Sequence, residues 1–577
     1  MKILLASILV LPLLVQAQKP QAAPSAEPAK SAPEEGIPVT NQLVISKCGA
    51  CHTKDEKGNM LRISWERATP EGWEEAIKRM VRLRGVSLTP EEARSVLKYL
   101  ATYHGLAPEE AKPIMYYAEH RAQDETNIPN DNVRGACANC HELARPLSWR
   151  RTAEDWKDLA NLHIALYPQA DEAFRLGINA GGFDEGQHHL DPGAPLPVDI
   201  ALAYLSKTAP LATPEWASWR ARMRAPKLTG KWIVSAYVPG RGKFYGEMEV
   251  EAANGTDDEF TTRVKLTSIK DGSTISRTGH SLVYAGYAWR GRSKGTMAAN
   301  AAPNDLGSDM REVMEVSSDQ STAEGRWFWG EYQEFGFDVK MRRASADPNL
   351  IVADRSLLKT GTQGTRVRLL GESLPAQITP ADLDFGSGVT VKRIVSHTPT
   401  EIVAEVDVAA DAVPGQRDIA FRRSVLTSAI AVYDRIDYVK VTPDSALAHL
   451  GSEKHPKGFQ QFEAIAYQRG ADGKSHTADD VELGPIDVNW SVEEFYSVYG
   501  DDDKEFVGSL SNNGLFSPSS DGPNPQRKFS RNNYGDVWVV ATAKDEKDKE
   551  GRPLIGKSYL VVTVPTYIKW DQPEVGQ

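Results

Sequence analysis

The chain has 577 residues, of which 41% are hydrophobic and 25% are charged, and its formal net charge at pH 7 is -11. A chain of this length exceeds what one hydrophobic core serves, so several domains are expected. The negative balance, without any concentrated basic stretch, excludes nucleic acid as a partner.

The first residues carry an export signal. Lys2 begins a short basic region, residues 3–15 are apolar, and residues 15–17 form a cleavage site of small side chains. The apolar run is too short for a stable membrane anchor, and no later stretch reaches transmembrane length. We therefore predict a signal peptide at 1–17, a disordered linker rich in Ala and Pro at 18–38, and a soluble periplasmic protein without a membrane anchor.

All four cysteines lie in two copies of the pattern C-x-x-C-H, at residues 48–52 and 137–141. This pattern is the attachment signal for c-type haem. Two thiols add to the vinyl groups of one porphyrin, and the adjacent histidine becomes the proximal ligand of the iron. The sequence therefore predicts two covalently bound haem c groups, attached through Cys48, Cys51, Cys137 and Cys140, with His52 and His141 as proximal ligands.

Two other roles of paired cysteines fit less well. Zinc ribbons separate their cysteine pairs by about 15–20 residues, whereas these pairs stand much further apart. Structural disulfides occur in exported proteins. Neither a zinc site nor a disulfide accounts for a histidine directly after each pair.

An internal repeat within residues 39–212 locates the candidate sixth ligands. Each haem motif is followed by a Ser-Trp pair and then by a second tryptophan, Trp73 or Trp156. Seven residues after this tryptophan stands Met80 in the first copy and His163 in the second, and both side chains are competent iron ligands. We predict that Met80 and His163 are the sixth ligands opposite His52 and His141.

Each copy of the repeat closes with an apolar helix, as small cytochromes c do. The first is expected to begin at Thr89 and Pro90 with a capping box and to stop at Gly105. The second is expected to begin near Leu196, after an insertion. These features predict a tandem, dihaem cytochrome c domain over residues 39–212.

Several other residues remain open as sixth ligands. For the first haem the rivals are Met60, His104 and Met115, and for the second they are His188 and His189 in the insertion. Thioether ligation raises the reduction potential of a haem, and a second imidazole lowers it. The two haems are therefore expected to be unequal electron carriers.

Three antiparallel β domains are expected to follow the helical one, which makes the fold class multidomain, α then all-β. Residues 213–345 contain aromatic-rich strands separated by glycines, which predicts a barrel or a sandwich. Residues 346–434 and 435–577 contain short strands at short intervals, which is typical of immunoglobulin-like sandwiches.

No catalytic residue is predicted, because the chain has no nucleophile motif, phosphate loop or histidine–carboxylate metal cluster. The acidic loop at residues 472–480 departs from the spacing of an EF-hand. A solvated turn is therefore favoured there over a Ca²⁺ site.

These features together resemble the large (α) subunit of quinohaemoprotein amine dehydrogenase, over essentially the whole mature chain. The haem motifs are generic, and the order and sizes of the four domains carry the resemblance. It implies two partners, a propeller-like β subunit and a small γ subunit that bears a cysteine tryptophylquinone. It also implies that the quinone oxidises a primary amine to an aldehyde and ammonia, and that the electrons leave through two haems to a soluble copper protein such as azurin or to a cytochrome c.

Two competing hypotheses come from other classes of protein. A dihaem cytochrome c peroxidase requires one haem with an open or displaceable site, which two strongly held sixth ligands oppose. A haem-containing sensor or adhesin normally keeps an anchor or a signalling segment. The implied electron-transfer role agrees best with the residues, because every cysteine is committed to haem and the quinone must therefore lie on another chain.

Overall fold

A computed structural model describes most of the chain. The described residues are 34–120, 128, 131–138, 140–176, 193–253, 255–297, 299, 301–330, 335–496, 501–548 and 550–565. The predicted signal peptide, most of the predicted linker, and the rival ligands His188 and His189 lie outside these residues. Within them, no helix is both long enough and apolar enough to cross a membrane.

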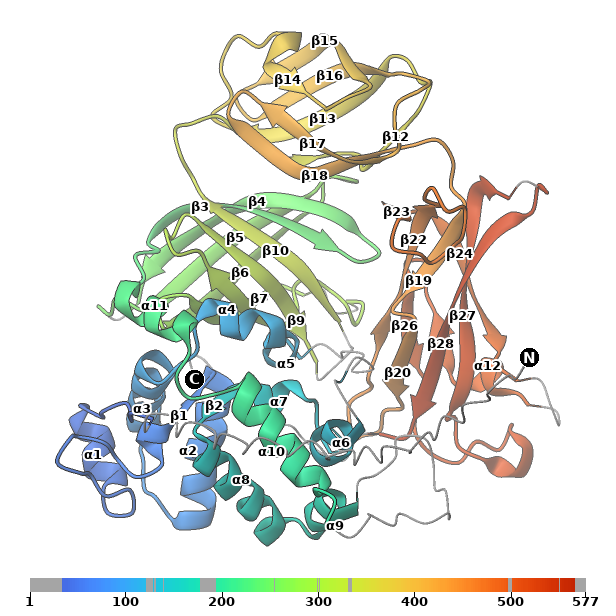
Figure 1. Ribbon diagram of the computed structural model, residues 1–577. Helices are drawn as coiled ribbons and strands as arrows, with labels where there is room; N and C mark the ends of the chain where they lie inside the picture. Colours follow the sequence, from blue (N-terminus) through green and yellow to red (C-terminus); the bar gives the residue numbers. More distant parts are fainter. Residues whose placement is uncertain are drawn as a thin grey trace, which may run out of the picture.

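The first domain is helical and contains both cysteine pairs (Figure 1). Its main elements are α1 (Gln42–Cys48), β1 (Glu66–Ala68), α2 (Pro70–Arg84), α3 (Pro90–Tyr103), α4 (Pro108–Ala111), α5 (Met115–Ala118), α6 (Asp131–Val133), α7 (Ala144–Leu147), β2 (Trp149–Arg151), α8 (Ala153–Leu166), α9 (Pro168–Leu176), α10 (Pro197–Thr208) and α11 (Pro214–Arg222).

The two copies of the repeat start their central helices in the same way. Thr69 precedes α2 and Thr152 precedes α8, and each side chain accepts a hydrogen bond from the backbone N–H three residues further on. Such caps satisfy donors that the first helical turn leaves without partners. The tryptophans that follow, Trp73 and Trp156, are buried in the core of the domain.

The closing helix of the first copy, α3, has the predicted capping box. The hydroxyl of Thr89 accepts from the backbone N–H of Glu92 at 3.2 Å, and the Glu92 carboxylate accepts from the backbone N–H of Thr89 at 2.9 Å. Gly105 lies just after the end of the helix. A Cβ added to Gly105 would lie only 2.2 Å from the carbonyl oxygen of Ala101, which is closer than two such atoms can approach. A side chain at this position would therefore force the local backbone to shift.

A short antiparallel ladder joins the two copies. Its strands are β1 and β2, which pair Glu66 with Arg151 and Ala68 with Trp149. Because one strand comes from each copy, the two copies form one hydrogen-bonded unit. The last residues of the predicted linker also contact this unit, since the N–H of Ile37 donates to the carbonyl oxygen of Ser64 at 2.8 Å. Ordered structure therefore begins before the predicted boundary at residue 38.

The second domain is a closed antiparallel barrel in the strand order β10-β3-β4-β5-β6-β7-β8-β9. The structure thus selects the barrel from the two architectures that the sequence allowed. Trp232, Trp289 and Trp327 fill its interior and are at most 1% exposed. The strands are β3 (Gly230–Val238), β4 (Gly242–Ala252), β5 (Glu259–Ser268), β6 (Thr274–Tyr284), β7 (Ala288–Gly295), β8 (Met310–Val316), β9 (Thr322–Trp329) and β10 (Phe335–Arg343).

The third domain is a sandwich of two sheets, ordered β11-β13-β16-β15 and β12-β18-β17-β14. Its core contains Val367, Ile402 and Phe421, which are completely buried. The strands are β11 (Asn349–Ala353), β12 (Leu357–Lys359), β13 (Thr365–Glu372), β14 (Leu383–Asp384), β15 (Val389–Thr398), β16 (Glu401–Val408), β17 (Gly415–Phe421) and β18 (Ser424–Tyr433).

The fourth domain has three sheets, ordered β19-β22-β23, β20-β28-β27-β24 and β21-β26-β25. Strand pairs in the β domains are antiparallel as predicted, except β12–β18 and β20–β28, where an early strand of each domain runs parallel to the last. The elements are β19 (Tyr438–Thr442), β20 (Ser445–His449), β21 (Gln460–Gln461), β22 (Glu463–Gln468), β23 (Val481–Pro485), β24 (Val488–Glu494), α12 (Asp503–Phe506), β25 (Gly508–Leu510), β26 (Leu515–Pro518), β27 (Gly535–Lys547) and β28 (Pro553–Thr563).

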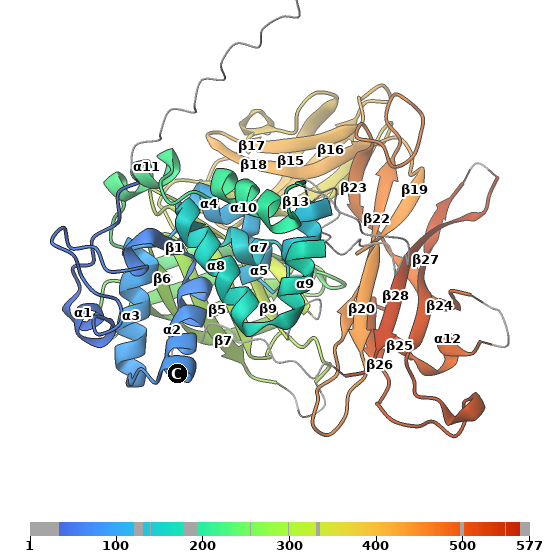
Figure 2. The ribbon, with the colours of Figure 1, turned by 60° about the horizontal axis from the view of Figure 1, so that its bottom comes forward.

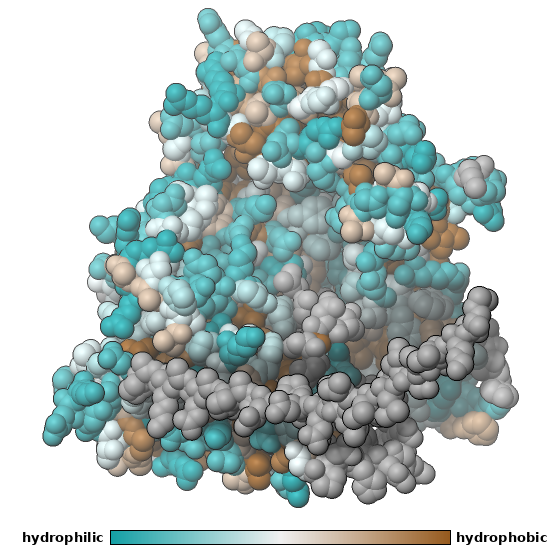
Figure 3. Space-filling view, in the orientation of Figure 1, coloured by the Kyte–Doolittle hydropathy of each residue, from teal (hydrophilic) through white to brown (hydrophobic). Residues whose placement is uncertain are grey.

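The barrel contacts each of the other three domains (Figures 1 and 2). Arg290 of β7 pairs with Glu71 of the helical domain at 2.5 Å. Lys243 of β4 donates to a backbone carbonyl of the third domain at 3.0 Å, and the Tyr237 hydroxyl donates to the carboxylate of Glu463 in the fourth. The face in Figure 3 carries mainly hydrophilic residues, while the core of the helical domain continues into barrel residues such as Leu282 and Tyr284.

Candidate haem sites

The second cysteine motif opens onto a cavity of about 520 Å³ between α8, α9 and α10. Four predicted site residues line it together, namely Cys137, Cys140, His141 and His163. The remaining walls are mainly apolar and include Trp149, Trp156, Leu159, Leu162, Phe174, Leu202 and Leu205. Residues nearly thirty positions apart in sequence thus converge on one enclosed space.

Both histidines of this cavity are oriented for metal ligation. Nδ1 of His163 lies 2.8 Å from the carbonyl oxygen of Leu159, one helical turn earlier, and Nδ1 of His141 lies 3.0 Å from that of Glu142. When Nδ1–H donates to a carbonyl, Nε2 is the unprotonated nitrogen and can bind a metal. Burial, with a smaller contribution from Arg145, lowers the pKa of His141 to about 4, so its imidazole is neutral at pH 7.

This donor set fits a c-type haem. Two thiols stand beside one imidazole, a second imidazole lies across the same cavity, and apolar walls suit the porphyrin faces. A four-cysteine zinc site does not fit, because the only cluster of three or more metal-binding side chains among the described residues is Asp501, Asp502 and Asp503. The two cysteine pairs therefore do not meet.

The first motif follows the same local pattern. Cys48 ends α1, and Nδ1 of His52 lies 2.8 Å from the carbonyl oxygen of Leu61, which again leaves Nε2 for a metal. Met80 lies on α2 in line with Trp73 and Ile77, which pack into the same core as Cys48. This core also contains Trp149 of the second copy, so the structure places Met80 on the face of α2 opposite Glu75 and Arg79 without assigning it to one haem motif.

The rival ligands for the first haem lie in other surroundings. Met60 and His104 are completely buried, and His104 stands edge-on to Trp73 with ring centroids 6.2 Å apart. Met115 belongs to a small cluster with Val313 and Phe328 of the barrel. Met115 thus contributes to the interface between the first two domains.

The sequence did not reveal the charged side chains that line the cavity at the second cysteine motif, called the second cavity below. These are Glu75, Arg79, Arg145 and Arg151. Glu75 and Arg79 belong to α2, in the first copy of the repeat. A signal was present, because they stand four residues apart and hence on one helix face. In a single sequence such a polar face is usually solvent-exposed, so the signal did not indicate a site.

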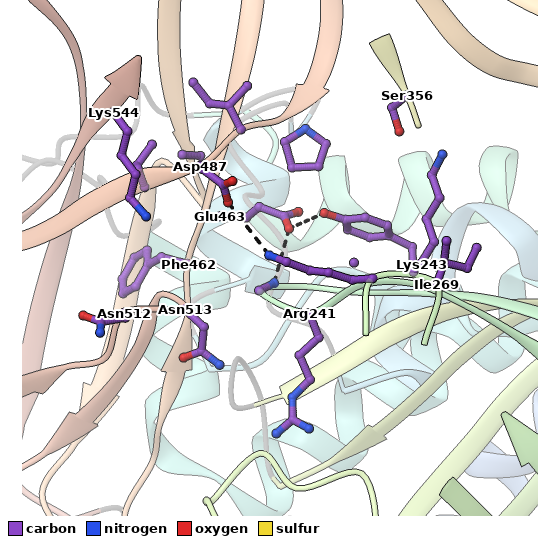
Figure 4. A pocket seen from close by; sticks show the side chains of 18 of the residues that line it. Arg241, Lys243, Ile269, Ser356, Phe462, Glu463, Asp487, Asn512, Asn513 and Lys544 are labelled. Carbon is purple, nitrogen blue, oxygen red and sulfur yellow. Dashed lines mark hydrogen bonds and ion pairs between the residues drawn. The ribbon is translucent and has the colours of Figure 1, made fainter. Parts of the chain in front are cut away.

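A separate interdomain cavity, of about 710 Å³, lies where the three β domains meet (Figure 4). Among the residues that the structure describes, no cysteine or histidine lines it. The carboxylate of Glu463 accepts hydrogen bonds there from the Tyr237 hydroxyl and from the backbone N–H of Gly240, while burial lowers the pKa of Lys243 to about 8. These polar contacts connect the barrel with the fourth domain.

The acidic segments of the fourth domain are occupied by internal contacts. In the loop at 472–480, the Asp480 carboxylate accepts from the Tyr438 hydroxyl at 2.7 Å and from the backbone N–H of Thr477 at 3.0 Å, which agrees with a hydrogen-bonded turn. In the cluster at 501–503, Arg531 pairs with Asp501 at 2.8 Å and with Asp503 at 2.9 Å.

Comparison with known proteins yields four family models, all of one subunit. They are the haem-binding model of the quinohemoprotein amine dehydrogenase alpha subunit over residues 39–186, and the models of its domain II over 225–344, domain III over 348–434 and domain IV over 439–575. A search of curated proteins found no match.

Among solved structures, a designed fluorescence-activating β-barrel aligns at 20% sequence identity and a TM-score of 0.16, over 20% of this chain and 93% of the design. Human protocadherin-24 EC1-2 aligns at 14% identity and a TM-score of 0.15, over 39% of this chain and 98% of that one. At these scores neither likeness bears on function. The four models, which follow one another in the order of the four folded domains, show that the chain belongs to the family of the quinohemoprotein amine dehydrogenase alpha subunit, the haem-binding subunit of an oxidoreductase.

Proposed function

We propose that this chain is the dihaem electron-transfer subunit of a periplasmic amine dehydrogenase, and that it takes electrons from a cysteine tryptophylquinone on a small partner subunit. One observation carries the proposal. Cys137, Cys140, His141 and His163 share a mainly apolar cavity, in a chain whose four domains all match one amine dehydrogenase subunit.

The side chains of this chain hold and tune the redox groups. Each haem, when bound, carries one electron by cycling its iron between the ferric and ferrous states. The proposed attachment residues are Cys48, Cys51, Cys137 and Cys140, and the proposed axial ligands are His52, Met80, His141 and His163. With both axial positions filled by side chains, neither iron offers an open site to a peroxide or an amine, so electron relay is the favoured role.

The proposed assembly contains a β-propeller-like β subunit and a quinone-bearing γ subunit. Because a thioether ligand favours the reduced state, the haem at His52 has the higher potential and stands nearer the exit. Its electrons pass to a soluble copper protein such as azurin or to a cytochrome c. The signal peptide at 1–17 directs the chain to the periplasm, where this exchange takes place.

The decisive experiment compares the isolated chain with the complete assembly. Amine oxidation requires an electrophilic carbonyl, which six-coordinate haems do not offer. In stopped-flow absorbance, a primary amine is expected to reduce the haems rapidly in the assembly and to leave those of the isolated chain oxidised. Amine-dependent reduction of the isolated chain at the rate of the assembly would place the catalytic centre in this sequence and refute the proposal.

Replacing the proposed thioether ligand is expected to change one haem only. A ferric haem with methionine ligation has a weak near-infrared charge-transfer band that a bis-histidine haem lacks. Met80→Ala should abolish this band and leave the second haem low-spin. Met115→Ala is the matched control, because Met115 packs against the barrel and its loss should leave the band intact. A band that survives in Met80→Ala would transfer the role to Met60 or Met115.

A further inference from the structure

Helix α2 presents opposite faces to the two candidate haem sites. Successive residues of a helix are turned by about 100°, so Trp73, Ile77 and Met80 share one face while Glu75 and Arg79 share the other. Trp73 and Ile77 on the first face belong to the core cluster against which Cys48 also packs, and the second face lines the cavity of the second copy. One helix therefore contributes to both sites.

Among the described residues that line the cavity there are three arginines and one carboxylate, that of Glu75. Arg145 pairs with Glu75 at 2.6 Å, and Arg151 pairs with Glu66 across the β1–β2 ladder. Arg79 is the third arginine of the cavity wall. Glu66 and Glu75 already form ion pairs with the other two arginines. The Nε atom of Arg79 is buried and has no hydrogen-bond partner among the described residues. Glu66 and Glu75 still attract Arg79 at longer range.

Arg79 is partly buried, and a guanidinium Nε removed from water without a hydrogen bond is costly, since desolvation of a charge must be offset by an anion or by hydrogen bonds. The missing partner must be anionic, and it must reach an apolar cavity bordered by Cys137 and Cys140. A carboxylate satisfies both conditions, because guanidinium groups bind carboxylates through paired N–H donors.

We propose that Arg79 binds a propionate carboxylate of the haem at His141, an inference that rests on the proposed function. Helix α2 then supplies a ligand to one haem through Met80 and a counter-charge to the other through the adjacent Arg79. Arg79 is a positioning residue. Its positive charge opposes the additional charge of ferric iron, so it raises the potential of the haem at His141.

The test is a spectroelectrochemical titration of the full chain carrying Arg79→Gln. At a fixed applied potential, the ferrous-to-ferric ratio of the haem at His141 should fall about tenfold, which corresponds to about 59 mV for a one-electron couple. The haem at His52, followed by its near-infrared band, should shift less. Arg79→Lys, which keeps the charge, should restore most of the loss.

The matched control is Arg84→Gln, which removes the same charge from an exposed position on the same helix and should shift neither haem. Equal shifts of both haems, or no shift in Arg79→Gln, would overturn the inference. Intact mass shows whether the protein carries two haems. If it does and Arg79→Gln shows no shift in potential, only the role of Arg79 is refuted, and the proposed function is not.

A free anion is the other source of negative charge at Arg79. At constant ionic strength, exchanging chloride for phosphate should leave the potential of the haem at His141 unchanged, because the propionate belongs to the haem itself. A potential that depends on the anion in the native chain but not in Arg79→Gln would assign the site to a dissolved anion and overturn the proposal.

Discussion

Cys137→Ala combined with Cys140→Ala is expected to remove one of two covalent haems completely. These are the cysteines that line the second cavity, so no thiol remains there to attach a porphyrin. Intact mass should fall by about one haem relative to the native chain, and haem staining on a denaturing gel should weaken by about half. The near-infrared band assigned to Met80 should persist, because its haem is attached through the other motif.

The reciprocal variant provides the control. Cys48→Ala with Cys51→Ala should also lose one haem, but here the near-infrared band should disappear. A native mass that corresponds to one haem or none would contradict the dihaem proposal, and loss of both haems in either variant would show that the sites do not form independently. The empty second cavity should also loosen α8 and α9, because their apolar side chains would lose what they pack against.

Glu71→Ala is expected to give the largest loss of stability at a domain interface. Glu71 and Arg290 join the helical domain to the barrel at 2.5 Å, and their side chains are only 4% and 5% exposed. Removing one partner of a buried ion pair leaves the other charge uncompensated, at a cost of about 3–5 kcal/mol. Denaturant unfolding should therefore show a lower midpoint or a separate transition of the helical domain.

An exposed pair of similar length is the control for this prediction. Lys231 and Glu247 stand 2.6 Å apart with side chains more than half exposed, and Glu247→Ala should cost less than about 1 kcal/mol. Equal losses in the two variants would mean that burial does not set the energy of the interface pair.

The pH dependence of the Glu71 effect has a definite sign. Burial raises the pKa of Glu71, but the attraction of Arg290 outweighs it, and the net pKa lies below its ordinary value of 4.5. Stabilisation by this carboxylate is therefore complete above the pKa of the unfolded chain and is lost as the pH falls through the folded pKa. The difference between native chain and Glu71→Ala should persist at neutral pH and shrink under acid conditions.

Local signals in the sequence predicted much of the candidate site. The equal distance from Trp73 to Met80 and from Trp156 to His163 placed both candidate ligands on central helices, and the structure puts His163 in one cavity with His141. The capping box at Thr89 was predicted because its determinants lie within four residues. The order of a helical domain followed by β domains was likewise confirmed.

Features that depend on distant residues could not be predicted. Arg79 lines a cavity of the second copy, and this depends on contacts between the two copies such as the pairing of β1 with β2. Closure of the barrel depends on pairing between β3 and β10, which begin and end that domain and leave no local sequence signal. The immunoglobulin-like character of the third and fourth domains stays a prediction, although both contain packed β-sheets.

The ladder between β1 and β2 also affects the order in which the helical domain can fold. Glu66 meets Arg151, a partner that stands 85 positions later in the chain, and Trp73 packs against Trp149 with ring centroids 5.4 Å apart. A newly made chain emerges from its amino end, so the first copy of the repeat has an unpaired strand edge, and Trp73 lacks the contact with Trp149, until the second copy has followed. We therefore expect a fragment that ends before residue 149 to expose this strand edge and tryptophan face and to aggregate.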